Sequence, residues 1–470
     1  MAFEELYAAR LDRYVAAMRG CTPDRVPLRP LAAEFTARYA GFTCQEITHD
    51  YRKAFEAVVR CCRDFPWDAA VPNMVYVWTG LTEAIGLRYY GVPGIHVGPD
   101  VGFQYREPAE ADAFMKREEY DELIEDPVRF LYETWLPRVS GDVAAKGQPT
   151  SYRNNLAFVK GGMAMLSYFQ SFGGQVERMR RECGTPSSIC GMLKAPLDIL
   201  ADKLRGYTAL VFDLMEIPEK VLEACQALMP HLAYLALTSA DPARILPIPI
   251  WMHRTSVPFI TREHFETIHW PTLRPIFDAL WQQGTQVLMY AEGKWDAHLE
   301  RFAELPAGSV IFHLDRTDAL VARRVLGSKF CLSGGVPNAL LAFGSTDDVT
   351  AQCRRLIETI GAEGGYIIDA SAIMQNDATV ENVRAMTNAT LEYGRYRSPS
   401  SPSASVPPAP PAPMPEWVAG AKPRPGICFP FEEKLREMPP VLGDAALLRD
   451  VWDDIEGLAY LYIWHVLLSF

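Results

Sequence analysis

The stretch QVLMYAEGK at residues 286–294 is a short apolar run that gives way abruptly to polar residues. Four similar runs lie between residues 246 and 394, each followed by polar residues. Short apolar runs that alternate with helical patterns predict buried parallel strands joined by crossover helices. The other runs are Ile248–Trp251, Ser309–His313, Lys329–Leu332 and Gly365–Ile368. The sequence therefore predicts an α/β fold with a parallel sheet or barrel.

The residues that directly follow these runs are of types common in catalytic and binding sites. In a parallel sheet or barrel the chemistry lies where the strands end at their carboxyl edge, so these side chains should gather there. This arrangement favours an enzyme. The residues are Met252, His253 and Arg254 after the first run, Glu292 after the second, Asp315 after the third, Asn338 after the fourth, and Asp369 and Ser371 after the fifth.

Composition limits the class of protein. The chain has 470 residues, 49% of them hydrophobic, which is enough for one large domain with additions. Its net charge of −12 argues against nucleic-acid and anionic-membrane partners, and no apolar run is long enough to predict a spanning helix. The ten cysteines form no Cys-x-x-Cys pair, and Met1–Leu6 lacks the pattern of a signal peptide. We expect reduced thiols and a cytoplasmic location.

Breaks in the pattern divide the chain into four parts. Residues 1–65 are expected to form a helical segment packed on a barrel of residues 66–396. An insertion at about residues 86–141, rich in glycine, proline and aromatic residues, is expected to cover the barrel mouth, with Tyr90 and His96 as contributors. Residues 398–415 are a proline-rich linker. The apolar tail of residues 416–470 should dock on its own domain or on a second subunit, which makes a homodimer possible.

The order of several short motifs resembles the uroporphyrinogen decarboxylase (URO-D) superfamily, which includes cobalamin-dependent methyltransferases. The resemblance covers most of residues 10–395 and implies a (β/α)8 TIM barrel with its site at the C-terminal face. The motifs are Pro23–Pro27, Ala37–Gly41, Pro218–Lys220, Phe259–Thr261, Leu280–Val287, Gly334–Pro337, Phe343–Thr346, Gly364–Ile368 and Glu381–Met386.

The sequence departs from this superfamily at two places that matter for function. True uroporphyrinogen decarboxylases carry an arginine-rich N-terminal segment, whereas the corresponding Val71–Trp78 has no arginine, which argues against a substrate with many carboxylates. The zinc-dependent methyltransferases carry His-x-Cys after a middle strand and another cysteine after the last one. Here those positions read Tyr290-Ala291-Glu292 and Asp369-Ala370-Ser371. A thiolate-bound zinc is therefore not expected, although Glu292, Asp315 and Asp369 could offer oxygen ligands to a harder metal.

Glu292 is the main catalytic candidate, because a carboxyl in a pocket can donate a proton to a leaving oxygen. Its alternative role is a salt bridge to Lys294. Tyr290 could donate a hydrogen bond into the pocket or fill the core, and His253 could be a base or a structural residue. Asp315 and Asp369 could belong to the site or cap the following helices, and His313 is expected in the core. Arg254, Asp369, Ser371 and Asn338 are expected to bind substrate.

Three functions remain open from the sequence. The first is methyl transfer from a small methylated substrate, such as an ether, to a corrinoid, with Glu292 as the acid. Because the chain has no Asp-x-His-x-x-Gly segment, the corrinoid would arrive on a partner protein or from solution. The second is a cofactor-free decarboxylase or lyase in which Arg254 holds a carboxylate. The third is a non-catalytic barrel subunit.

Overall fold

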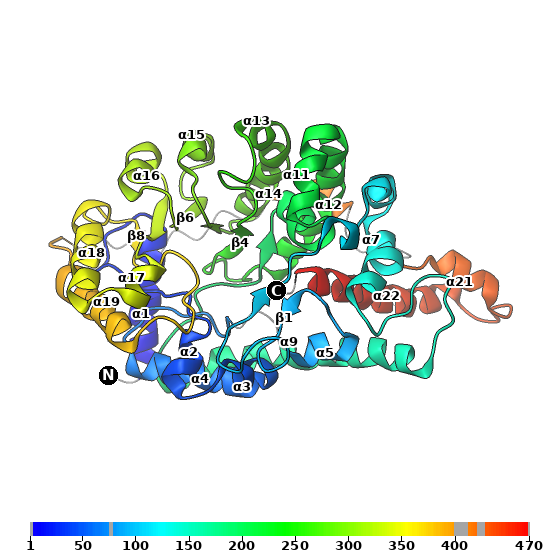
Figure 1. Cartoon of the computed structure of the whole chain (residues 1–470), viewed down its shortest axis with the longest axis horizontal. Helices are drawn as coiled ribbons and strands as arrows, with labels where there is room; N and C mark the ends of the chain where they lie inside the picture. Colours follow the sequence, from blue (N-terminus) through cyan, green and yellow to red (C-terminus); the bar gives the residue numbers. More distant parts are fainter. Residues whose placement is uncertain (1–2, 75–78, 399–411, 421–427, 469–470) are drawn as a thin grey trace.

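The computed structural model describes residues 3–74, 79–398, 412–420 and 428–468, and many of its helices form an arc around a central set of strands (Figure 1). Six strands form a parallel sheet in the order β3-β4-β5-β6-β7-β8. The five apolar runs predicted as strands correspond to β4 through β8. The bounds are β3 (Leu193–Lys194), β4 (Ile248–Met252), β5 (Val287–Ala291), β6 (Val310–Leu314), β7 (Cys331–Gly334) and β8 (Tyr366–Ile367).

Two extended segments complete the circuit of this sheet. Residues 26–33 run parallel to β8, where the Arg29 N–H donates to the Ile368 carbonyl oxygen at 3.2 Å. Residues 68–71 lie beside that segment and beside the chain that leads into β3. The Asp68 N–H donates to the Leu28 carbonyl at 2.8 Å, and the Ser188 N–H donates to the Ala70 carbonyl at 3.0 Å. Six strands and two segments make the (β/α)8 barrel that the sequence predicts.

The first barrel segment lies upstream of the predicted boundary. Residues 1–65 are expected to form a helical segment packed on the barrel, whereas residues 26–33 are part of its ring. Pro27 and Pro30 explain the difference, because proline lacks the N–H that a strand needs and so weakens the strand pattern.

Helices that follow the strands cover the outside of the ring. Their apolar faces pack on the sheet, as in other barrels of alternating strands and helices. In chain order after β3 they are α10 (Pro196–Ile199), η4 (Leu200–Leu204), α11 (Tyr207–Glu216), α12 (Pro218–Ser239), α13 (Arg262–His264), η5 (Phe265–His269), α14 (Trp270–Gln282), η6 (Asp296–His298), α15 (Leu299–Phe302), α16 (Ala319–Leu326), α17 (Asn338–Phe343), α18 (Thr346–Thr359) and α19 (Val380–Tyr393).

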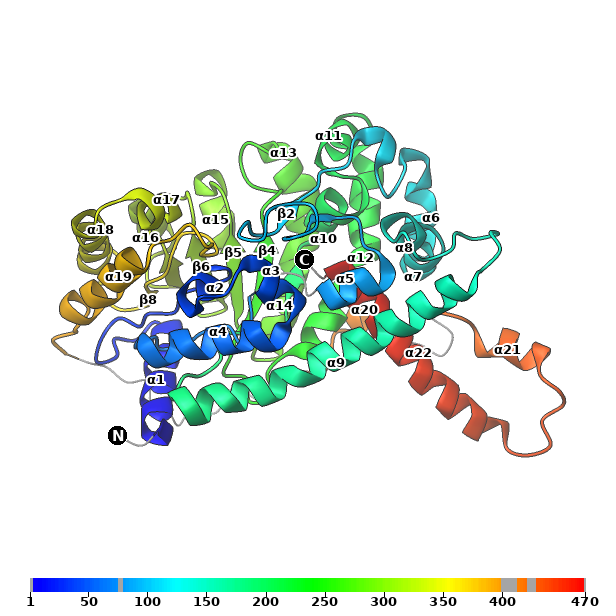
Figure 2. The same cartoon turned by 60° about the horizontal axis from the view of Figure 1, so that its bottom comes forward.

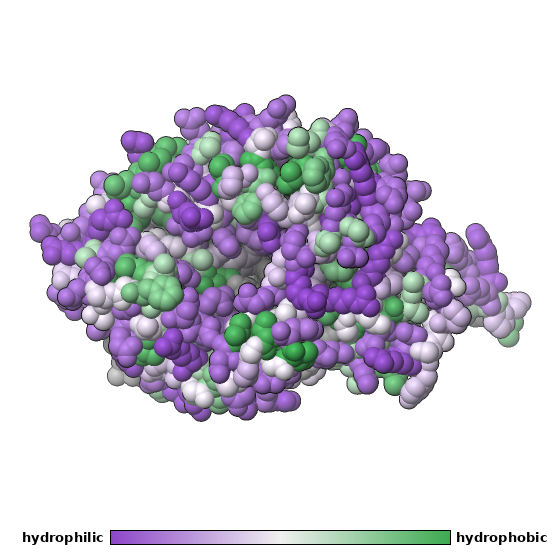
Figure 3. All heavy atoms as spheres, viewed as in Figure 1, coloured by the Kyte–Doolittle hydropathy of each residue, from purple (hydrophilic) through white to green (hydrophobic). Residues whose placement is uncertain are grey.

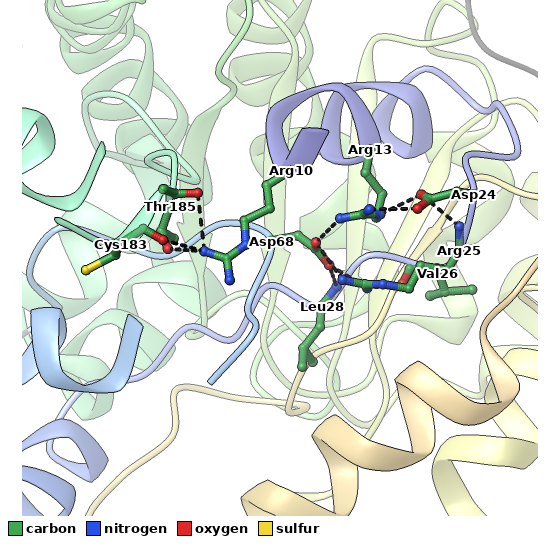
Figure 4. A network of polar contacts seen from close by, with 10 residues as sticks. Arg10, Arg13, Asp24, Arg25, Val26, Leu28, Asp68, Cys183 and Thr185 are labelled. Carbon is green, nitrogen blue, oxygen red and sulfur yellow. Dashed lines mark hydrogen bonds and ion pairs between the residues drawn. The ribbon is translucent and has the colours of Figure 1, made fainter. Parts of the chain in front are cut away.

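Helix α1 (Phe3–Met18) closes the end of the barrel opposite the carboxyl ends of the strands. Its Tyr14 packs in one apolar cluster with Leu288 and Ile311 of the barrel interior. A polar network fixes the helix in place (Figure 4). In that network Arg13 and Arg25 both bind the buried carboxylate of Asp68.

A long insertion separates the second and third barrel strands. It contains the antiparallel pair β1 (Tyr90–Gly91) and β2 (Gln104–Tyr105) and ends in the long helix α9 (Tyr152–Cys183). Its other elements are α5 (Thr79–Ile85), η1 (Glu110–Asp112), η2 (Arg117–Glu119), α6 (Tyr120–Glu125), α7 (Pro127–Phe130), η3 (Leu131–Trp135) and α8 (Leu136–Val139). Three helices lie earlier, between the two extended segments: α2 (Phe35–Ala40), α3 (Cys44–His49) and α4 (Tyr51–Asp64).

The C-terminal part consists of α20 (Glu416–Ala419), α21 (Phe431–Glu437) and α22 (Ala445–Leu468). The second half of α22 packs on the body of the protein. The Tyr132 hydroxyl donates to the Ala459 carbonyl at 2.5 Å, and the Tyr460 hydroxyl lies 2.9 Å from His231 Nδ1. Most of the predicted proline-rich linker, residues 399–411, lies outside the described residues. Among the helices described, none combines the length and apolarity needed to cross a membrane.

Candidate active site

The side chains that point into the barrel lie in layers. Successive residues of a strand face opposite sides, so Leu288, Tyr290 and Glu292 of β5 and its end share the inner side. Residues Leu288, Ile311, Cys331 and Ile367 form one apolar cluster with α1. Tyr290, His313, Ser333 and Asp369 come two residues later on the same strands and are fully buried. Glu292, Asp315 and Ser371 follow at the carboxyl edge.

Glu292 and Asp315 lie beside each other at this edge. They directly follow Ala291 and Leu314, which are paired across β5 and β6. The Gly293 N–H donates to Asp315 Oδ2 at 2.8 Å, which fixes the second carboxyl in place. Burial, together with the negative charge of Glu292, raises the pKa of Asp315 to about 6. Two neighbouring carboxyls of this kind hold a proton near neutral pH more readily than an isolated one.

Tyr290 lies below this pair, inside a stack of rings. The centroid of its ring is 3.9 Å from that of Trp251, which is tilted against it, and 4.6 Å from that of His313, which is nearly parallel to it. His313 Nδ1 lies 3.0 Å from Ser333 Oγ, and Nε2 lies 3.1 Å from the Ser371 carbonyl. Burial, with the charge of Arg29 adding to it, holds the pKa of His313 well below its usual value. Tyr290 and His313 therefore form the floor beneath Glu292, with a neutral imidazole.

Asp369 is also deep in the barrel, opposite a buried cation. Its Oδ2 lies 3.4 Å from the Arg29 guanidinium, and both side chains are fully buried. Burial raises the pKa of Asp369 to about 7, although Arg29 and the N–H groups of Leu31 and Ala370 oppose this shift. Asp369 is thus the counter-ion of Arg29.

His253 and Arg254, after β4, share one buried carboxylate that sequence reasoning missed. His253 Nε2 lies 2.8 Å from Asp202 Oδ2, and Arg254 Nε lies 3.3 Å from Asp202 Oδ1. Lys194 of β3 pairs with the same carboxylate. Burial alone would raise the pKa of Asp202. The charges of His253 and Lys194 nevertheless hold this pKa well below its usual value. Asp202 is therefore an ionised anchor for three basic side chains.

A second missed carboxylate, Asp198, holds the backbone at the same strand end. Its Oδ1 accepts the N–H groups of His253 and Arg254 at 3.0 and 2.8 Å, and its Oδ2 accepts the Thr255 hydroxyl at 2.9 Å. Asp198 and Asp202 lie on short helices after a two-residue strand, which gives no sequence pattern. Their four-residue spacing, one helical turn, is the only signal that could have pointed to them.

Residues of the insertion contact this side of the mouth. The Tyr105 hydroxyl of β2 donates to the Asp202 carbonyl at 2.5 Å, and Glu107 Oε2 lies 3.6 Å from the Arg254 guanidinium. Arg254 also lies over the Tyr105 ring, 5.2 Å from its centroid. Further in, the Lys203 amine donates to the Tyr90 hydroxyl at 3.0 Å, and burial lowers the pKa of this lysine well below its usual value. His96 stabilises the turn to which it belongs, because its Nδ1 accepts a hydrogen bond from the Val92 N–H.

Ser371 and Asn338 shape the loop after β8. The Ser371 N–H donates to the Val336 carbonyl at 2.7 Å, and the Asn338 amide bridges the Ala372 N–H and the Ile373 carbonyl. Both residues lie at the mouth, but the contacts of Asn338 are with this loop itself. The face in Figure 3 is hollowed near its centre, between the loops of the barrel and the N-terminal helices.

The donor atoms do not match the zinc set of the superfamily's methyltransferases. Tyr290 and Glu292 stand where the resemblance places the histidine and cysteine of His-x-Cys, and Asp369-Ala370-Ser371 stands where it places the last cysteine. Tyr290 is enclosed by two rings. Throughout the described ranges, no group of three or more His, Cys, Asp or Glu side chains is arranged to hold a metal ion. The predicted trio of Glu292, Asp315 and Asp369 is not such a group in the part of the chain that the structure describes, and Asp369 pairs with Arg29 instead. The residues present offer two adjacent oxygen ligands, from Glu292 and Asp315.

Comparisons with known proteins agree with this geometry. Residues 163–393 match the family model described as uroporphyrinogen decarboxylase (URO-D). A uroporphyrinogen decarboxylase from Anaeromyxobacter dehalogenans (strain 2CP-C) is 27% identical over 135 residues, which are 29% of this chain. The match spans only 38% of the length of that relative. A solved structure, a methyltransferase from Methanosarcina mazei, superposes with a TM-score of 0.54 at 14% identity and covers 81% of this chain and 98% of its own. That likeness establishes the barrel fold.

Proposed function

Because residues 163–393 match the URO-D family model, we propose that the chain is a URO-D-like methyltransferase. In this proposal it moves a methyl group from a small methylated substrate, such as an ether, to a corrinoid carried by a partner protein. The observation that carries the proposal is the adjacent pair of carboxyls, Glu292 and Asp315, at the carboxyl edge of the barrel. The barrel likeness to a methyltransferase structure supports it.

The carboxyl pair suits the hardest step of ether demethylation. An alkoxide or phenolate leaves poorly, so the oxygen must receive a proton as its bond to the methyl group breaks. The corrinoid, when bound, supplies a cobalt centre that accepts the methyl group. Glu292 is the proposed acid, and the raised pKa of Asp315, which the Gly293 N–H fixes beside it, lets that carboxyl hold a proton and supply it to Glu292.

The surrounding residues position the substrate and exclude water. The rings of Trp251, Tyr290 and His313 form an aromatic floor below the acid, suited to a small methylated group. Tyr105 and Glu107 of the insertion close the side of the mouth over Arg254. A low-dielectric site of this kind strengthens the interaction of the acid with the leaving oxygen.

The runner-up, a decarboxylase or lyase acting on a small acid, needs a cation free to bind the substrate carboxylate. Arg254 was the candidate for that role, but its guanidinium lies between Asp202 and Glu107. A substrate carboxylate would have to displace one of them. The arrangement thus favours methyl transfer.

Product analysis separates the two functions. The purified protein is incubated with cob(I)alamin and a panel of alkyl and aryl methyl ethers, and separately with small carboxylic acids without corrinoid. The proposal predicts methylcobalamin from at least one ether, detected by its absorbance, and no carbon dioxide from the acids. Carbon dioxide release without corrinoid, or no methylcobalamin from any ether, would contradict it.

A further inference from the structure

The first half of helix α22 extends away from the body of the protein (Figure 2). Four apolar side chains on it are between 55 and 66% exposed: Leu447, Val451, Ile455 and Leu458. They are spaced by four, four and three residues, so they lie along one side of the helix. We call these four residues the arm stripe. An apolar row of this length on a projecting helix is typical of an interaction surface.

The other side of the projecting helix is already covered within the chain. The Trp452 indole N–H donates to the Phe429 carbonyl at 3.1 Å, and its ring lies 6.4 Å from that of Phe431 on α21. Arg449 pairs with Glu432 of α21. The arm is therefore a defined helical hairpin that buries one side and presents the arm stripe on another.

Helix α9 carries a matching row on its outer side. Its inner side is buried, with Ala157, Gly161 and Met165 facing the body. On the outer side, Tyr152, Val159, Met163 and Leu166 are between 44 and 79% exposed, at spacings of seven, four and three residues. We call these residues the α9 stripe. A helix that is apolar on opposite sides is normally covered on both.

Within one chain, the side of α22 that carries the arm stripe meets the inner side of α9, opposite the α9 stripe. The spacing of the arm stripe continues into Tyr462 and His465, four and seven residues after Leu458. Tyr462 packs over Gly161 of α9, where a Cβ would overlap its hydroxyl, and His465 contacts Phe169 at 5.2 Å between ring centroids. The side of α22 that packs on α9 in the second half is thus the side left exposed in the first half.

Charges beside the two stripes are complementary. Asp450 and Asp454 are exposed on the flank of the arm stripe, and neither has an ion pair within the described ranges. Lys160 is exposed on the flank of the α9 stripe and likewise has no ion pair there. Opposite charges at the rim of an apolar contact favour one register over others.

We propose that two copies of this chain associate about a two-fold axis, with the arm stripe of each copy packed on the α9 stripe of the other. Both surfaces belong to the same chain, so a reciprocal exchange buries both stripes of both copies and leaves neither exposed. Such a contact is closed and cannot extend into a filament. The inference concerns a surface away from the barrel mouth and does not depend on the proposed function.

The oligomeric state of two single variants tests this arrangement. Val451→Asp changes the arm stripe, Met163→Glu changes the α9 stripe, and Leu320→Asp changes an exposed leucine of α16 as the matched control. Sedimentation velocity across a concentration series gives the mass and the dimer dissociation constant. We expect twice the chain mass of 52.6 kDa for the wild type and the control. Each stripe variant should raise the dissociation constant by about tenfold or more, since it buries a charge in an apolar contact.

A charge exchange distinguishes this contact from a loss of folding. Asp454→Lys and Lys160→Glu each place like charges together and should weaken the dimer, whereas the double variant should restore it. Unchanged circular dichroism in all variants confirms folding. A monomeric wild type overturns the proposal, as does a dimer weakened by only one of the two stripe variants. A monomer that instead binds phosphatidylcholine vesicles assigns the stripes to a lipid surface and also overturns it.

Discussion

Glu292 and Asp315 end adjacent strands of the barrel, and burial together with the charge of Glu292 raises the pKa of Asp315 to about 6. The relation follows from the parallel register of β5 and β6, since Ala291 and Leu314 are paired and the next residue of each strand enters the mouth. Of the other buried carboxylates near the mouth, Asp202 and Asp369 pair with basic side chains, and Asp198 accepts two backbone N–H groups and a hydroxyl. The pair is thus the group best placed to hold and release a proton.

Asp315→Asn should slow methyl transfer and remove the fall in rate expected as pH rises through about 6. The pKa of Asp315 is raised to about 6, so this carboxyl holds a proton below that pH, whereas an asparagine cannot supply one. The measurement is the rate of methylcobalamin formation between pH 5 and 9. An unchanged profile would mean that Asp315 does not act on the acid.

Arg29→Met should destabilise the protein most at alkaline pH. It leaves Asp369 buried without its cation, and loss of one partner of a buried pair costs about 3–5 kcal/mol. The raised pKa of Asp369 means that its contribution to stability is present below the unfolded value and is lost as pH rises through about 7. Urea unfolding at pH 5 and pH 8 measures the difference. The double variant Arg29→Met, Asp369→Asn should recover part of the loss at pH 8, and equal losses at both pH values would argue against this pairing.

Glu34→Gln should stabilise the protein at pH 8 and have little effect at pH 4. Burial raises the pKa of Glu34 to about 7, only partly offset by the N–H groups of Glu34 itself and of Phe103. The group therefore favours folding while protonated and opposes it as pH rises through 7, by up to about 3 kcal/mol. Thermal unfolding at the two pH values tests this, with Glu363→Gln on the exposed surface as the control. A Glu34→Gln variant less stable than wild type at pH 8 would contradict the account.

Asp202→Asn should destabilise the protein by about 3–5 kcal/mol at pH 7, because it leaves the buried Lys194 without its counter-charge. The depressed pKa of Asp202 means that its stabilisation is present above the unfolded value and is lost only in acid. Asp121→Asn, which removes an exposed pair with Lys220, is the matched control and should cost no more than about 1 kcal/mol. Equal effects of the two substitutions in urea unfolding would show that Asp202 is no anchor.

The later half of the barrel could be predicted from the sequence, and the earlier half could not. Strands β4 to β8 are short buried runs that end in polar residues, and this pattern can be recognised in the sequence alone. The first strand is interrupted by Pro27 and Pro30, and the second is only residues 68–71. Such segments are held in the ring by their neighbours rather than by their own strand propensity.

The candidate site could likewise be predicted only in part from the sequence. The proximity of Glu292 and Asp315 follows from their places after paired strands, so sequence reasoning reached it. Asp198, Asp202 and Lys194 follow the two-residue strand β3, where neither burial nor pairing leaves a pattern. The buried position of Asp369 could not be predicted either, because Asp369 is paired with Arg29, which lies in the segment expected to be helical.

The rate of methyl transfer to cob(I)alamin in wild type, Glu292→Gln and Glu300→Gln tests the central claim most directly. Glu300 is an exposed residue of α15, so its substitution controls for the change of charge. We predict that Glu292→Gln slows transfer from an active methyl ether by about 10²- to 10⁴-fold, the usual effect of losing a general acid, while Glu300→Gln leaves the rate unchanged. A correctly folded Glu292→Gln variant that transfers the methyl group as fast as the wild type would contradict the account.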